Sequence, residues 1–151
     1  MGVLSEEELA AEAQRRAAAE GAKVELFIYR PSVNCHGPWM CLELAGVPYV
    51  LVDIDLEKKE HLTEEFRKLN PNCKVPVLRD TDGTCVWESN AIMRYICEKH
   101  KLTDLYPTDP KARARCDQAL DYKLHKAFPT CAQLAYPRLG WSWMIQDQSE
   151  P

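Results

Sequence analysis

Ser32 and Cys35 stand three residues apart, directly after the apolar segment 24–28. This is the spacing of the CxxC pair of disulfide oxidoreductases, with a serine in place of the first cysteine, so dithiol chemistry is not expected. Cys35 alone remains an alternative nucleophile that would act through mixed disulfides, and a contact with the neighbouring His36 would lower its pKa. The simpler interpretation is that Cys35 is a small buried residue at the start of a helix.

Cysteines are scattered along the chain, at positions 35, 41, 73, 85, 97, 116 and 131. They form no CxxC pair and have no regular spacing, which argues against a disulfide framework and against a zinc site, so no metal is expected. Unpaired cysteines in this number indicate a reducing environment. We therefore expect the protein in the cytoplasm or in another reducing intracellular compartment.

Composition and charge are those of an ordinary globular protein, because 46% of the 151 residues are hydrophobic and 28% are charged. The length allows one principal core with some additional helix. The formal net charge of -4 gives no reason to expect nucleic acid as a partner. No apolar run is long enough for membrane insertion.

Residues 1–22 are predicted to form an extension helix outside the main fold. Ser5 and Glu8 make a capping box, and the alanine-rich and glutamate-rich run behind them favours helix until Gly21. The many acidic residues argue against a targeting peptide.

Residues 23–102 carry the pattern of an α/β domain with the element order β-α-β-α-β-β-α. Val24, Leu26 and Ile28 alternate in a first strand that is expected to have one buried face. The remaining expected elements are a loop at 32–37, a helix ending at Gly46, a strand at 49–54, a helix at 62–69, hairpin strands at 75–78 and 84–87, and a helix capped by Ser89.

Residues 103–108 show no clear period and are interpreted as an interdomain linker. Asp109 and Pro110 then supply an N-cap and a first helical residue. The predicted helix runs to Phe128 and carries an apolar stripe that must pack on something. After Pro129, the sequence fits either another short helix or a partly exposed arm containing Trp141 and Trp143.

Three segments of the chain resemble the glutathione-binding half and linker of soluble glutathione transferases, especially the theta and delta-like classes. They are HLTEEFRKLNPNCKVPVL, WESNAIMRYICEKH and LYPTDPKARA, and a weaker similarity extends from Lys23 to Leu124. The resemblance implies a thioredoxin-like domain at 23–102, followed by part of the family's all-helical second domain at 109–151. It also implies glutathione as substrate or ligand.

The resemblance assigns the middle and the γ-glutamyl end of glutathione to four residues. It implies that the Val75–Pro76 peptide bond is cis and that the Val75 backbone pairs in antiparallel fashion with the cysteinyl part of the ligand. Glu88 and Ser89 match the acidic and hydroxyl pair that receives the γ-glutamyl end at a helix N-terminus. The alternatives are an ordinary trans proline in an edge strand and a plain helix cap beside a solvated acid.

At the other two ends of the ligand, the resemblance assigns His61 and Lys74 to the glycyl carboxylate and Ser32 to the thiolate. Each of these residues has a simpler interpretation as a surface or loop side chain. The chain also departs from the family near Ser32, because Asn34 and His36 stand where a proline and an arginine are common.

Two functions follow from these observations. The first is a glutathione S-transferase that conjugates the glutathione thiolate to a soft electrophile, as in detoxification. The second is a noncatalytic transferase-like subunit or adaptor in a larger protein assembly, which the short segment after the linker favours. In either case the uncovered apolar stripe predicts a homodimer or a heteromeric assembly rather than an isolated monomer.

Overall fold

The structure, a computed structural model, describes residues 23–142. The chain forms two compact units that divide between Leu105 and Tyr106, within the segment expected as a linker, and each unit is described by itself. The expected helix at 1–22 and Trp143 lie outside the described residues.

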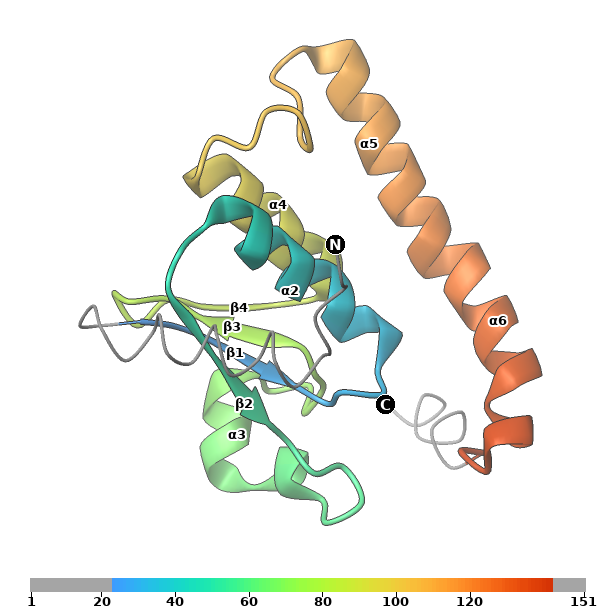
Figure 1. Cartoon of the computed structure of the whole chain (residues 1–151). Helices are drawn as coiled ribbons and strands as arrows, with labels where there is room; N and C mark the ends of the chain where they lie inside the picture. The colour runs from blue at the N-terminus through green and yellow to red at the C-terminus, as the bar shows by residue number, and fades with distance from the viewer. Residues whose placement is uncertain (1–22, 143–151) are drawn as a thin grey trace, which may run out of the picture. The chain divides into compact units, whose positions relative to one another are not determined.

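The first unit contains a four-stranded mixed sheet and three α-helices (Figure 1). Its elements are β1 (Val24–Ile28), α2 (Val33–Ala45), β2 (Tyr49–Asp53), α3 (Glu64–Leu69), β3 (Val77–Arg79), β4 (Cys85–Trp87) and α4 (Ser89–Lys99). The strand order is β2-β1-β3-β4, with β1 parallel to β2 and antiparallel to β3, and β3 antiparallel to β4. The expected thioredoxin-like order β-α-β-α-β-β-α is confirmed.

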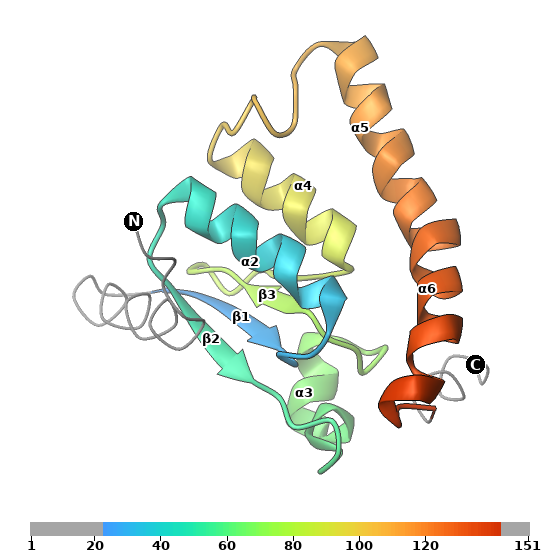
Figure 2. The same ribbon diagram turned by 45° about the vertical axis from the view of Figure 1, so that its right-hand side comes forward.

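Both faces of the sheet are covered. Helices α2 and α4 lie side by side on one face, and α3 lies on the other (Figures 1 and 2). Phe27 of β1 packs edge-on against Phe66 of α3, with ring centroids 6.3 Å apart, and Val77 joins this cluster. The expectation that β1 has only one buried face is therefore wrong, because α3 covers Phe27 while Leu26 and Ile28 are buried on the opposite face.

Helix α2 begins earlier than the sequence predicts, so residues 33–37 are helical and not a loop. Ser32 occupies the N-cap position with an extended backbone, and the peptide N–H of Cys35 donates to its carbonyl at 3.0 Å. The predicted loop is wrong because a Gly-Pro pair, here Gly37 and Pro38, ordinarily indicates a turn. Pro38 is fully buried inside the helix, so its packing offsets the backbone hydrogen bond that a proline cannot form.

The start of α4 also differs from the prediction by one residue. Ser89 is the first residue of the helix, and Glu88 occupies the N-cap position with φ of 71°. The hairpin strands are shorter than expected, since β3 begins at Val77 and β4 at Cys85. The segment before Val77, which contains a cis peptide bond between Val75 and Pro76, does not join the ladder.

The second unit is a helical segment that includes α5 (Pro110–Tyr122) and α6 (Phe128–Ala135), joined by a π-helical turn at Lys123–Ala127. Asp109 caps α5 as expected, because its carboxylate accepts a hydrogen bond from the Ala112 peptide N–H at 2.9 Å. The predicted end at Phe128 is wrong, since α6 continues through Pro129. Widening to a π-turn directly before Pro129 relieves the clash of the proline ring with the preceding turn.

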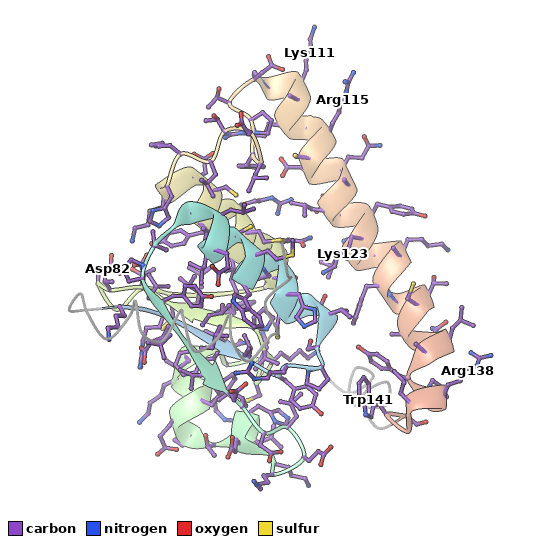
Figure 3. The ribbon with its side chains drawn as sticks, in the orientation of Figure 1. Asp82, Lys111, Arg115, Lys123, Arg138 and Trp141 are labelled. Atoms are coloured by element: carbon purple, nitrogen blue, oxygen red, sulfur yellow. The ribbon has the colours of Figure 1, made fainter. Side chains whose placement is uncertain are left out.

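The far end of this unit carries an aromatic cluster, in which Tyr136 makes edge contacts with Phe128 and Trp141 at centroid distances of 6.4 and 6.0 Å. Figure 3 shows Lys111 and Arg115 projecting from the first turns of α5 at the opposite end. None of the helices described within residues 23–142 is long and apolar enough to cross a membrane.

Asp80 ties the end of β3 to α4. Its carboxylate is buried and accepts hydrogen bonds from the Tyr95 hydroxyl, from Lys99 Nζ and from the Thr81 peptide N–H. Burial alone would raise the pKa of this carboxyl, but the hydrogen bonds from Lys99, Tyr95 and Thr81 outweigh it and lower the pKa to about 2.

We expect this carboxylate to make the protein acid-sensitive. A carboxyl group with a depressed pKa in the folded state contributes stability above its unfolded pKa of about 3.9, and the contribution, about 2 kcal/mol here, is lost as the pH falls toward 2. The Asp80→Asn variant should lose most of that pH dependence in urea unfolding curves measured between about pH 7 and pH 2. Asp104→Asn, an exposed control, should behave like wild type; equal acid sensitivity of Asp80→Asn would contradict the assignment.

Candidate functional site

Most of the residues expected to contact a ligand fall near one edge of the sheet, and the strand directions explain why. Phe27, Val77 and Trp87 lie opposite one another across β1, β3 and β4. Because β3 runs antiparallel to both neighbours, its beginning lies beside the ends of β1 and β4. Ser32 follows β1, Val75 precedes β3 and Glu88 follows β4, so the pairing brings these three chain segments to the same edge.

Ser32 stands at the N-terminus of α2. Its peptide N–H donates to the Tyr29 carbonyl at 2.8 Å, which closes the turn between β1 and the helix. Its hydroxyl makes no capping hydrogen bond with α2. A half-buried hydroxyl at the positive end of a helix dipole is suited to donate to an anion.

The loop before β3 presents backbone at this edge. The Val75–Pro76 peptide bond is cis, Pro76 is buried, and Val75 packs beside the Phe27 cluster. The buried Asn70 holds the loop, because its Nδ2 donates to the Lys74 carbonyl at 2.7 Å and its Oδ1 accepts from the Asn72 peptide N–H at 3.0 Å.

Asn70 is a residue that sequence reasoning treated only as a helix stop. The signal that identifies it is the Asn-Pro pair after a helix, because asparagine side chains bond readily to nearby backbone groups in turns. Its role here is to fix the conformation of the backbone immediately before Val75.

Glu88 and Ser89 form the junction between β4 and α4. Glu88 is exposed, with φ of 71° and ψ of 117°, a conformation that a non-glycine residue adopts at a cost of about 1 kcal/mol or more. Ser89 and Asn90 are buried in the first turn of the helix. The first peptide N–H groups of a helix lack partners within the helix, so this junction combines an exposed carboxylate with an anion-binding helix end.

His61 and Lys74 lie in different environments. His61, in the short 3-10 helix Glu60–Leu62 after β2, is buried, so its interpretation as a surface side chain is wrong. Lys74 is exposed and directly precedes Val75, so its ammonium group is available to an anion at this edge.

Cys35 does not have the surroundings of a nucleophile. Its side chain is fully buried, and His36 Nε2 lies 2.9 Å from the Arg30 carbonyl, which makes that carbonyl its acceptor. Cys41 is also buried, and burial together with the neighbouring Cys97 raises its pKa to about 12. The simpler interpretation of Cys35, a small buried residue in the first turn of a helix, agrees with its position.

Comparison with known proteins gives the family. Residues 31–99 match the family model for the glutathione S-transferase N-terminal domain. Glutathione S-transferase 1 of Manduca sexta is 41% identical over 104 residues, which cover 68% of this chain and 48% of the relative. Human glutathione S-transferase theta-1 is 38% identical over 129 residues, which cover 85% of this chain and 53% of the relative.

A solved structure supports the same assignment. A glutathione transferase homologue from Sulfitobacter, crystallised with bound glutathione, superimposes with a TM-score of 0.68 at 26% identity and covers 74% of this chain and 53% of its own. The chain spans about half the length of the curated relatives it matches. The matching domain, the similar sequences and the shared thioredoxin-like fold lead to one conclusion: this chain belongs to the soluble glutathione S-transferase family.

Proposed function

We propose that the edge formed by Ser32, Val75 and Glu88 binds glutathione, and that the chain acts as a glutathione S-transferase that conjugates the bound thiolate to a soft electrophile. The observation that carries this proposal is the convergence of the Val75–Pro76 backbone, which lies outside the strand ladder, and two helix N-termini at one edge of the sheet. A tripeptide with two carboxylates, an ammonium group and a thiol needs such a combination.

Val75 supplies the contact for the middle of the ligand. Within residues 23–142, no backbone group forms a hydrogen bond with the peptide N–H or carbonyl of Val75. These two groups are arranged to pair with an extended peptide in the manner of an added strand. The cysteinyl residue of glutathione is the part that we assign to this position.

The charged ends of glutathione find complementary groups on either side of Val75. The N-terminus of α4 and the Ser89 hydroxyl receive the γ-glutamyl carboxylate, while the exposed Glu88 carboxylate neutralises the ammonium group. Lys74 provides a positive charge for the glycyl carboxylate. His61, whose side chain is buried, is assigned to the same carboxylate.

Ser32 is assigned to the reacting sulfur. A thiol with a pKa of about 8.5 is only a few per cent ionised at neutral pH, so a transferase must stabilise the anion. Donation from the Ser32 hydroxyl and the positive end of the α2 dipole both lower the free energy of the thiolate. The same geometry supports the buried Cys35 as a packing residue and not as the nucleophile.

The first test is glutathione binding itself. Glu88→Ala should weaken binding by about 1 to 3 kcal/mol, because a charge-assisted contact with the ammonium group is lost. Calorimetric titration of the pure chain measures this change. Glu98→Ala, which removes an exposed glutamate at the other end of α4, should bind like wild type. No heat and no chemical-shift change for wild type at millimolar glutathione would overturn the proposed function.

The second test concerns the thiolate. Ser32→Ala should raise the apparent pKa of the bound thiol and lower turnover with an electrophile at neutral pH, since alanine cannot donate to the sulfur. Cys35→Ala should change both quantities much less. An inactive Cys35→Ala beside a fully active Ser32→Ala would transfer the mechanism to the cysteine.

We also propose that residues 103–108 act as the linker to part of a helical second domain. The compartment that we propose is a reducing intracellular one. We further propose that the chain works as a homodimer or within a larger assembly. No residue of α5 is buried, and Tyr122, Leu134 and Leu139 are each more than half exposed. Apolar surface of this kind ordinarily becomes buried at an interface.

Sedimentation of the purified 17.3 kDa chain at micromolar concentration tests the assembly. The expected result is a species heavier than one chain, because burial of apolar area contributes about 25 cal/mol per Å2. A well-folded monomer that binds no hydrophobic dye would show that the chain covers its own apolar residues.

A further inference from the structure

Arg30 lies in the turn between β1 and α2 that leads to Ser32, and this turn is held by contacts of Arg30 on two sides. On one side, the Arg30 guanidinium makes a two-pronged contact with Asp53 at the end of β2, at 2.9 and 3.0 Å. On the other side, His36 in α2 lies with Nε2 2.9 Å from the Arg30 carbonyl. Because a carbonyl only accepts hydrogen bonds, His36 must donate through Nε2.

The indole of Trp39 adds a third contact to the same residue. The guanidinium carbon of Arg30 lies 5.9 Å from the centroid of the indole, within the range of a cation–π contact. Trp39 is itself oriented, since its Nε1 donates to the Tyr49 hydroxyl at 2.6 Å. The Arg30 side chain is therefore held between β2 and α2.

These contacts restrict the backbone that leads to Ser32. The donor from His36 orients the peptide plane between Arg30 and Pro31, and the proline ring fixes the following φ near -65°. The remaining rotation is fixed because the Ser32 peptide N–H donates to the Tyr29 carbonyl at 2.8 Å. The position of the Ser32 backbone, and with it the direction of the Cα–Cβ bond, thus depends on the hydrogen bond that comes from His36.

We propose that His36 and Asp53 are positioning residues for Ser32, which act through Arg30 to hold the hydroxyl where it meets the thiolate. This inference rests on the proposed function, because it assigns the orientation of the group that ionises the thiol. It also gives a role to His36, one of the residues at which this chain departs from the pattern common in its family.

The contacts of Arg30 with Asp53 and His36 are suited to orienting the turn and contribute little to global stability. The side chains of Arg30 and Asp53 are 36% and 55% exposed, and ion pairs with such exposure contribute at most about 1 kcal/mol to folding. Removal of either contact, by a change at His36 or at Asp53, should therefore leave the domain folded while the turn relaxes. A change in the ionisation of the bound thiol is the signature that a purely structural role would not produce.

The test measures the pKa of the thiol of bound glutathione, from the ultraviolet absorbance of the thiolate in a pH titration of the binary complex. His36→Phe keeps a ring of similar size but lacks the donor, and should raise this pKa by about half a unit to one unit, which lowers the thiolate fraction about three- to tenfold at pH values well below the pKa. His36→Gln restores an N–H donor and should recover at least half of the shift.

Asp53→Asn provides a second variant at an exposed position and should also raise the thiol pKa. The double variant with His36→Phe should shift it by less than the two single shifts added together, because both residues act on one turn. Asp82→Asn, which changes an exposed aspartate in the turn between β3 and β4, is the control and should leave the thiol pKa unchanged (Figure 3).

Calorimetry of the same variants separates this inference from the proposed function. The dissociation constant of glutathione should change less than about threefold in His36→Phe and Asp53→Asn, since Val75, Glu88 and Ser89 are untouched. Wild-type binding together with a wild-type thiol pKa in both variants would overturn the positioning role and leave the proposed function standing. A wild-type chain that binds no glutathione would overturn the proposed function first.

Discussion

The antiparallel pairing of β3 with both β1 and β4 is the constraint on which the site depends. Val77 lies opposite Phe27 on one side and Trp87 on the other, so the chain must enter β3 at the edge where β1 and β4 end. A parallel β3 would place the Val75–Pro76 segment at the other end of the sheet. The same pairing directs two helix N-termini to one edge, since α2 and α4 begin within a few residues of the ends of β1 and β4.

Burial on both faces of the sheet supports this edge. Phe27 and Phe66 close one face, while Leu26 and Ile28 are buried on the face that α2 and α4 cover. At the opposite end of β3, the Asp80 carboxylate joins the strand to α4 through Tyr95 and Lys99. The residues proposed to bind the ligand therefore lie at the ends of strands and helices that are packed along the rest of their length. Such packing favours a preorganised binding site.

Ser32, at the start of α2, and the thiols of Cys35 and Cys41 in the same helix have different surroundings. Cys35 lies three residues from Ser32 in sequence, yet its side chain points into the core while the serine stands at the helix N-terminus. Cys41 is also buried, and burial raises its pKa to about 12, which keeps it in the unreactive thiol form. The proposed reaction therefore draws on the sulfur of the ligand and not on a sulfur of the protein.

Periodicity and turn residues in the sequence determined the element order, the end of α2 at Gly46 and the Asp109 cap, because these are local properties of the backbone. Motif similarity supplied the residues proposed to bind glutathione. Only the tertiary structure decided that α2 passes through Pro38, that His61 is buried and that His36 bonds to Arg30 rather than to Cys35. Each of these outcomes depends on packing or on contacts between segments far from one another along the chain, and local sequence signals carry no information about such partners.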